Sequence, residues 1–160
     1  MHIDPLEKKW LYVVVAMTVV MVGSMTYAAV VMNLNPPSNI ETIDPATLHL
    51  SGEFTEDNLG VSENPDGSYT VRMIAGRYSF YPQQIELPVD SDVTFRITSP
   101  DVLHGVHVPF TNMSTMVVPG YVAEVTTRFT REGEFQFLCN EYCGLGHDYM
   151  WSRLKVTPKG

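Results

Sequence analysis

An uncharged run of 23 residues, from Trp10 to Met32, constrains this chain of 160 residues more than any other feature. As an α-helix it would extend about 35 Å, at roughly 1.5 Å per residue, which is enough to cross a bilayer core of about 30 Å. A secretory signal has a shorter apolar region of about 7 to 15 residues and ends at a small-residue cleavage site. We therefore expect a retained membrane-spanning helix over residues 10–32, rather than a signal peptide or a buried core helix.

The charges beside this run predict how the helix is oriented. Lys8 and Lys9 precede it, whereas the next lysine or arginine is Arg72. Positively charged flanks stay on the cytoplasmic side of a membrane. We therefore expect residues 1–9 to be cytoplasmic, and the rest of the chain to face the periplasm or exterior of a prokaryotic cell. The span would contact the lipid of the plasma membrane.

The net charge of −8 belongs to the part beyond the span, because the first 32 residues carry two acids and two bases. An acidic surface argues against a nucleic acid as partner. It either attracts a basic soluble protein or simply keeps the domain soluble. If the charge steers a protein partner, association should slow as salt concentration rises.

Beyond the span, the chain divides into a polar stretch and a domain of short strands. Residues 33–67 combine a proline-containing stretch with an acidic loop, and we expect them to be a linker. Over residues 68–160, apolar residues alternate with polar ones between glycine and proline turns, which predicts an all-β antiparallel sandwich or Greek-key barrel. The expected strands cover residues 69–74, 92–98, 124–129, 134–138 and 151–156.

Four potential metal ligands lie within twelve residues near the C-terminus: Cys139, Cys143, His147 and Met150 in the run CNEYCGLGHDYM. A fifth, His104, lies upstream. Thiolates, imidazoles and a thioether together favour copper over calcium, magnesium or manganese. A mononuclear electron-transfer copper needs two histidines, one cysteine and an axial methionine. The additional cysteine allows two sulfurs to bridge two ions, so the pattern favours a dinuclear copper electron-transfer centre.

Two alternatives use the cysteines differently. A disulfide between Cys139 and Cys143 is compatible with their spacing, but it has no use for the neighbouring His147 and Met150. A mononuclear site would leave Cys139 idle. For either copper site, we expect the Cys-to-Met loop to converge with His104, which we place in a loop at the same end of the barrel. The other histidines are expected to be structural or solvated: His2, His49 and His107.

These ligands, with the runs YPQQIELPVDSDVTFRITSPDVLHGVHV and VVPGYVAEVTTRF, resemble subunit II of the haem–copper oxygen reductases, which bears the dinuclear CuA centre. The resemblance covers nearly the whole chain, and the single span and short length are similar to the B-type branch of the cytochrome c oxidases. It implies a cupredoxin-like Greek-key barrel behind one N-terminal transmembrane helix.

The resemblance also implies a role for each ligand. Cys139 and Cys143 would bridge two coppers, and His104 and His147 would each cap one. The weak ligands would be Met150 and the backbone carbonyl of Glu141.

Many family members use a glutamate at the position of Glu141 in a magnesium site shared with subunit I. We therefore weigh an Mg²⁺ or Mn²⁺ role for this carboxylate against an ordinary interfacial one. The aromatic residues Tyr78, Phe80 and Tyr81 are either part of the core or line the point where electrons enter.

The function implied is to accept single electrons from cytochrome c or a small copper protein. The electrons would pass to haem in subunit I, where oxygen is reduced and protons are pumped. The haems belong to that partner, so this chain alone would only transfer electrons. Three alternatives stay open: a tethered mononuclear blue-copper shuttle, a quinol oxidase subunit that keeps the fold without copper, and the CuA subunit of a nitric oxide or nitrous oxide reductase.

Overall fold

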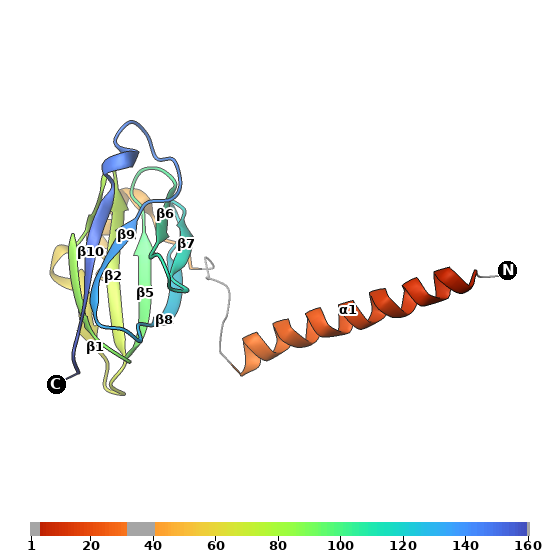
Figure 1. Cartoon of the computed structure of the whole chain (residues 1–160). Helices are drawn as coiled ribbons and strands as arrows, with labels where there is room; N and C mark the ends of the chain where they lie inside the picture. The colour runs from red at the N-terminus through yellow and green to blue at the C-terminus, as the bar shows by residue number, and fades with distance from the viewer. Residues whose placement is uncertain (1–3, 32–40, 160) are drawn as a thin grey trace. The chain divides into compact units, whose positions relative to one another are not determined.

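The computed structural model describes residues 4–31 and 41–159 of the chain, in two units (Figure 1). The first unit is the helix α1 (Pro5–Val30), and none of its residues is buried. Asp4 caps it by accepting a hydrogen bond from the Leu6 amide, and Pro5 occupies the first turn. The cap explains why α1 begins five residues before the predicted span. Residue 32, at the predicted end, lies outside the described residues.

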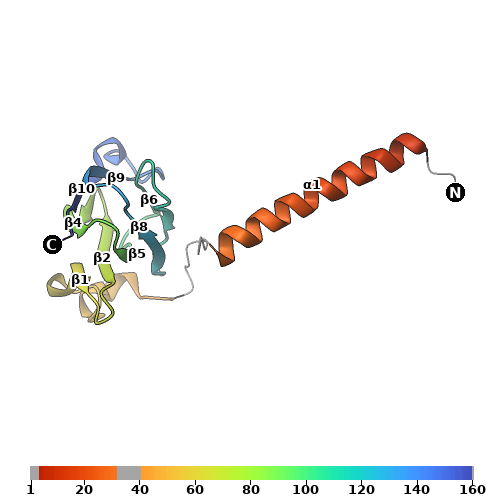
Figure 2. The same cartoon turned by 60° about the horizontal axis from the view of Figure 1, so that its bottom comes forward.

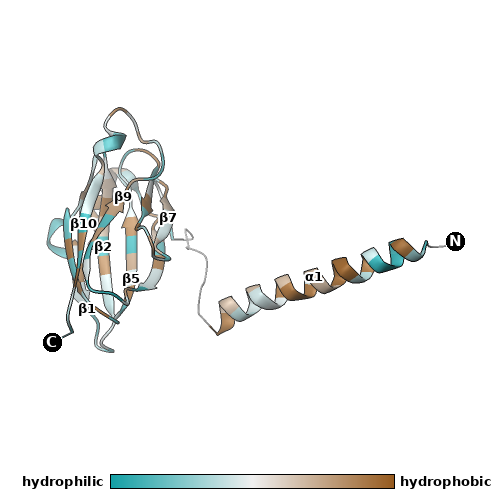
Figure 3. Cartoon of the chain, in the orientation of Figure 1, coloured by the Kyte–Doolittle hydropathy of each residue, from teal (hydrophilic) through white to brown (hydrophobic). Residues whose placement is uncertain are grey.

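The composition of α1 supports the predicted span. The helix is long and apolar enough to cross a membrane, and its 26 residues would extend about 39 Å. Figure 3 shows hydrophobic colouring along most of its length, with the hydrophilic part toward the N-terminal end. Thr18, Ser24 and Thr26 bond their hydroxyls to carbonyls of the preceding turn, so these polar groups need no external partner.

Two sheets form the second unit, and Figure 2 shows them from another side. In the first sheet the strand order is β1-β2-β5-β8, with β3 also paired to β2, and in the second it is β4-β10-β9-β6-β7. The strands are β1 (Gly60–Glu63), β2 (Tyr69–Gly76), β3 (Ser79–Tyr81), β4 (Gln84–Pro88), β5 (Asp92–Thr98), β6 (His104–His107), β7 (Ser114–Val117), β8 (Ala123–Arg128), β9 (Gly133–Leu138) and β10 (Trp151–Thr157).

The sequence predicts five of these strands, and their register places one apolar face inward. In β5, for example, Val93, Phe95 and Ile97 are buried. Aromatic rings from both sheets meet in the core, where the ring centroids of Phe95 and Phe137 lie 5.4 Å apart. The sheets are not purely antiparallel, because β2 pairs with β5 and β4 pairs with β10 in parallel. The predicted sandwich is therefore confirmed, with mixed strand directions.

Residues 41–63 differ from the expected linker. Leu48, in a 3₁₀ turn (Pro45–Leu50), is buried, and so is Phe54, which precedes a second turn (Glu56–Asn58). The segment is also tied by its backbone, since the amide of Ile43 donates to the carbonyl of Gly120 at 3.0 Å. β1 then pairs with β2. Two isolated apolar residues in a polar stretch give no periodic signal, so the sequence did not reveal this packing. Residues 33–40 of the expected linker lie outside the described residues.

An ion-pair cluster, the Arg96 cluster, fastens this segment to the first sheet. The guanidinium of Arg96 on β5 donates to the carboxylates of Glu41, Glu53 and Glu124, at 2.5 to 3.0 Å. Hydrogen bonds, foremost those to Glu53, raise the pKa of Arg96 despite its partial burial. Arg72 adds a longer contact of 3.6 Å to Glu53. The cluster thus joins four segments of the chain.

Candidate metal centre

The predicted ligands lie at one end of the sandwich, on elements that approach each other there. Cys139 follows β9 and Met150 precedes β10, so the intervening stretch, here the Cys139–Met150 loop, projects beyond the strands (Figure 1). The sequence predicted a loop at His104, but this residue is the first of β6 and pairs with Val117. The turn after β5 carries the chain into the second sheet, where β6 lies beside β9.

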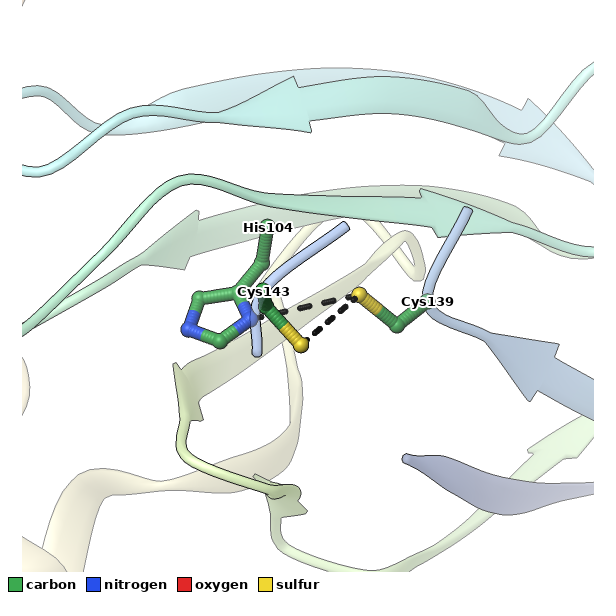
Figure 4. Close-up of side chains that lie close together, drawn as sticks. All are labelled: His104, Cys139 and Cys143. Carbon is green, nitrogen blue, oxygen red and sulfur yellow. Dashed lines mark hydrogen bonds between the residues drawn. The ribbon is translucent and has the colours of Figure 1, made fainter. Parts of the chain in front are cut away.

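All the predicted donor groups meet at this end. The Sγ atoms of Cys139 and Cys143 lie 3.8 Å apart, and both thiols are free. Nδ1 of His104 is 3.9 Å from Sγ of Cys139, as Figure 4 shows. On the other side, Sγ of Cys143 lies 3.6 Å from Nδ1 of His147 and 3.6 Å from Sδ of Met150. The carbonyl oxygen of Glu141 is 3.2 Å from Sγ of Cys139.

These donors are largely shielded from solvent. His104 is fully buried, the two cysteines and Met150 are buried, and His147 is partly exposed. Ligand atoms of His104, Cys139 and Cys143 all lie within 4.8 Å of one another. The strands thus hold soft donor atoms inside the protein, close enough to share an ion.

The electrostatics of the two thiols differ. Burial raises the pKa of Cys139, but hydrogen bonds from His104 and from the backbone of Gly105 and Glu141 outweigh it and lower the pKa overall. Burial and the neighbouring Cys139 sulfur raise the pKa of Cys143. Two adjacent thiolates repel one another, so both are ionised together most easily when a cation lies between them.

A carboxylate behind His104 fixes the direction of its ring. Oδ1 of Asp101 lies 2.8 Å from Nε2 of His104, which leaves Nδ1 facing Cys139. Burial raises the pKa of Asp101, but hydrogen bonds from His104 and from the backbone amides of Arg77 and Val102 outweigh it and lower the pKa overall. Ligand histidines commonly have such a carboxylate partner, because it fixes the tautomer and the ring orientation.

The donor set fits copper, and fits more than one ion. Two thiols, two imidazoles, a thioether and a carbonyl oxygen are gathered here. This is more than a single four-coordinate ion takes. Soft sulfur and imidazole donors select copper or zinc rather than hard cations. A thioether is a typical weak ligand of electron-transfer copper, which favours copper here.

The remaining predicted residues are spread around this end. The carbonyl of Glu141 points toward Cys139, while its side-chain Cγ lies over Gly105. Phe80 is fully buried in the core, whereas Tyr78 is 37 % exposed beside the loop. Tyr81 is exposed on β3.

The other described histidines are not part of this group of donors. His107 lies on β6 opposite Leu138, and His49 is exposed in the first 3₁₀ turn. His2 lies outside the described residues.

Sequence analysis missed two residues that shape the site. Asp101 could have been found from its spacing of three residues before His104. Gly105 gave no local signal: a Cβ there would lie 2.9 Å from Cγ of Glu141 and would overlap the side chain of Asn140. The glycine leaves room for the segment between the two cysteines to lie against β6.

Comparisons with known proteins agree with this geometry. The family model for "Cytochrome C oxidase subunit II, periplasmic domain" matches residues 72–156. Cytochrome c oxidase subunit 2 of Thermus thermophilus is 37% identical over 152 residues, which cover 94% of this chain and 90% of that protein. The chain belongs to the cytochrome c oxidase subunit II family. A second Thermus thermophilus subunit 2 is 39% identical over 121 residues, covering 76% of this chain and 90% of that protein.

Solved structures agree as well. A chain of a heme-copper terminal oxidase, determined as a dimer, superposes with a TM-score of 0.76 at 26% identity, and the match covers 95% of this chain and 99% of that one. The periplasmic domain of subunit II of the Bradyrhizobium japonicum oxidase superposes with a TM-score of 0.52 at 18% identity, over 56% of this chain and 84% of that one. The latter shows the fold alone, which is that of a cupredoxin.

Family membership settles the general role of the chain. It is the copper-binding, electron-accepting subunit of a haem–copper oxidase, an oxidoreductase complex in which subunit II associates with subunit I. The apolar helix agrees with a membrane-bound subunit. The matches give no support to a separate blue-copper shuttle, a quinol oxidase subunit or a nitric oxide reductase subunit. The B-type resemblance is consistent with the Thermus relatives.

Proposed function

We propose that this subunit holds a dinuclear CuA centre. Cys139 and Cys143 bridge the two coppers, and His104 and His147 each cap one. The weak ligands are Met150 and the backbone carbonyl of Glu141. The observation that carries this proposal is the pair of free thiols 3.8 Å apart, with an imidazole next to each. This distance is less than the summed length of two metal–thiolate bonds of about 2.3 Å each, so one ion can contact both sulfurs.

The bound coppers supply one-electron redox chemistry, while the protein fixes the ligands. His104 is held by its strand and by Asp101, and Cys139 and Met150 adjoin the ends of paired strands. Ligands fixed in this way move little when an electron arrives or leaves, so the structural cost of each transfer stays small. Burial of the sulfurs keeps water from the metal.

Electrons would enter and leave near the Cys139–Met150 loop, because this surface lies nearest the donor atoms. Its exposed side chains are largely apolar: Tyr142 is 75 %, Leu145 94 % and Tyr149 80 % exposed. Such a surface suits contact with other proteins. We propose that it serves the electron donor, cytochrome c or a small copper protein, and subunit I, whose haem receives the electrons for oxygen reduction and proton pumping.

Several acidic side chains form ion pairs within the domain. Glu41, Glu53 and Glu124 are engaged by Arg96. Asp92 pairs with Arg128. The net charge of −8 already counts these arginines, so the domain stays negatively charged, and its association with a basic electron donor should slow as the salt concentration rises.

Helix α1 would anchor the subunit in the plasma membrane of a prokaryote, in contact with lipid. The lysines before the span support a cytoplasmic N-terminus, and hence a metal domain on the periplasmic or outer face. We propose the segment limits 1–9, 10–32, 33–67 and 68–160 as cytoplasmic terminus, span, connection and copper domain. The packing of residues 41–63 favours counting them with the domain.

The Glu141 carboxylate has a separate role from its carbonyl. The side chain is partly exposed, so it can face a neighbouring subunit. We propose that it is an interfacial carboxylate rather than a ligand of Mg²⁺ or Mn²⁺.

Copper analysis with electron spin resonance tests the dinuclear proposal. The reduced chain, loaded with copper, should bind two ions and show a hyperfine pattern from two equivalent copper nuclei. Cys139→Ser should lose that pattern, because one bridge is missing. A blue chain with one copper and single-nucleus hyperfine structure would instead support the mononuclear alternative. Two tightly bound ions in Cys139→Ser would remove the bridging role.

A further inference from the structure

The turn between β2 and β3 reaches the Cys139–Met150 loop through one aromatic ring. A Cβ on Gly144 would lie 2.6 Å from Oη of Tyr78, and a Cβ on Gly146 would overlap the ring of the same tyrosine. Both glycines therefore leave room for Tyr78. Gly144 has a φ of +130°, a conformation that favours glycine in any case. Gly146 has a φ of −95°, so its backbone does not require glycine, and the ring is what excludes a side chain there.

The two glycines flank the part of the loop that carries two donors. Gly144 follows Cys143, and Gly146 precedes His147 in the 3₁₀ turn His147–Tyr149. The carbonyl of Gly144 accepts from the amide of His147 at 3.1 Å, and that of Gly146 accepts from Tyr149 at 3.1 Å. A change in the packing of the Tyr78 ring would therefore act on the backbone next to Cys143 and His147.

The same turn is also tied to the other half of the site. Oδ2 of Asp101 accepts from the backbone amide of Arg77 at 2.8 Å, while Oδ1 lies 2.8 Å from Nε2 of His104. Arg77 immediately precedes Tyr78. One carboxylate therefore connects His104 to the turn, and one ring connects the turn to Cys143 and His147. The loop itself is otherwise exposed at its tip, where Leu145 is 94 % accessible.

We propose that Tyr78 is a positioning residue for the copper centre. Its ring holds the Gly144–Gly146 segment so that Cys143 and His147 keep their positions relative to His104. The inference rests on the proposed copper site and assigns Tyr78 a mechanical role in place of the electron path considered from the sequence. The contacts involve the ring face as well as the hydroxyl, so packing should matter more than the hydrogen-bonding group. Loss of the ring should loosen the loop before it affects the strands.

Hydrogen exchange on the reduced, metal-free chain tests this role without copper. The amides of His147 and Tyr149 should exchange about tenfold faster or more in Tyr78→Ala, while amides of β5 keep their wild-type rates. Tyr78→Phe should stay near wild type, because it keeps the ring. Tyr121→Ala is the matched control, since Tyr121 is 41 % exposed and lies outside the loop. If β5 also exchanges faster in Tyr78→Ala, Tyr78→Leu replaces it as the test variant.

Copper release provides the second readout. Transfer to a chelator should be about 10-fold to 100-fold faster in Tyr78→Ala than in wild type, a range typical for residues that support ligands. Gly146→Ala should also speed release, but much less in the Tyr78→Ala background, because the clash has been removed. Wild-type loop exchange and copper release in Tyr78→Ala would overturn the inference. A wild-type chain without the dinuclear signal would overturn the proposed centre instead, and the exchange result would still decide whether Tyr78 holds the loop.

Discussion

The group of proposed copper ligands, here the ligand cluster, and the Arg96 cluster both join segments far apart in the sequence, but their polar groups are paired in different ways. In the Arg96 cluster, one guanidinium donates to three carboxylates, so each charged group has an oppositely charged partner within the protein. In the ligand cluster, two thiols face imidazoles and a thioether, with no lysine or arginine among the donor contacts that the structure describes. The first cluster pairs its charges internally, whereas the second offers donor atoms that could hold a cation.

The pKa shifts express the same difference. Hydrogen bonds to carboxylates raise the pKa of Arg96 and favour its charged form. Burial and a neighbouring sulfur raise the pKa of Cys143 and favour its neutral form. Hydrogen bonds lower the pKa of Cys139, so only the second thiolate is disfavoured. A polar cluster that stabilises its own charges serves the fold, and one that disfavours a second thiolate until an ion arrives is suited to metal binding. This comparison leads to five predictions.

The largest effect is expected for Cys143→Ser. The proposed dinuclear centre should be lost, because a hydroxyl does not replace a bridging thiolate. The fold should persist, since serine is close to cysteine in size and the metal-free core is unchanged. Copper content and electron spin resonance measure the first effect, and thermal unfolding of the metal-free chain measures the second. Collapse of the metal-free fold would mean that the ligand cluster is structural after all.

Arg96→Ala should have the opposite profile. Glu41 and Glu124 lose their partner and Glu53 keeps only its longer contact with Arg72, so the free energy of unfolding should fall by about 2 kcal/mol, while the copper spectrum stays unchanged. Denaturant unfolding followed by tryptophan fluorescence measures the loss. Arg128→Ala is the control, because its pair with Asp92 is exposed and should contribute little to the free energy of unfolding. Equal losses in both variants would remove the distinction between the Arg96 cluster and an ordinary surface pair.

Acid should weaken copper binding while leaving the Arg96 cluster intact. Copper binds both cysteines as thiolates. In the metal-free chain, the raised pKa of Cys143 keeps its thiol protonated at neutral pH. Binding then releases at least one proton, so affinity should fall about tenfold for each pH unit lowered. Below the lowered pKa of Cys139, a second proton competes and the dependence steepens. Chelator competition between pH 8 and pH 5 measures how copper affinity depends on pH. An affinity that does not change with pH would contradict the thiolate ligands.

Met150→Leu should alter the tuning of the site without dismantling it. Met150 is buried with Sδ 3.6 Å from Sγ of Cys143, so leucine fills a similar volume but removes the thioether. A weak axial ligand tunes the reduction potential more than it retains the metal. Voltammetry should therefore show a shifted potential, with two coppers still bound. An unchanged potential would take Met150 off the ligand set.

The smallest effect on copper is expected for Glu141→Gln. Only the backbone carbonyl of Glu141 faces Cys139, and any side chain leaves that carbonyl in place. The copper spectrum should match wild type, while electron passage to subunit I or a hard cation bound at the interface is free to change. Spectroscopy on the isolated chain and rapid-mixing kinetics on the complex separate the two. A collapsed copper signal would show that the carboxylate itself is a ligand.

The amino-acid sequence by itself determined the span, the chemistry of the centre and half of the strands. An uncharged run as long as a bilayer is thick leaves few choices for residues 10–32. The donor types at Cys139, Cys143, His147 and Met150 favour copper over hard cations whatever the surrounding fold. The longer strands alternate over six or more residues, so a buried and an exposed face can be recognised locally.

The tertiary structure alone decided the rest. β3 and β6 are three and four residues long, too short for a periodic signal. β6 also pairs with β9, far along the chain, where His107 lies opposite Leu138. His104 joins the thiols because the second sheet places β6 beside β9, and Tyr78 reaches Gly146 across nearly seventy residues. Such contacts depend on where separate strands meet in space. Local patterning reports which face of a segment is buried, but not which segment will cover it.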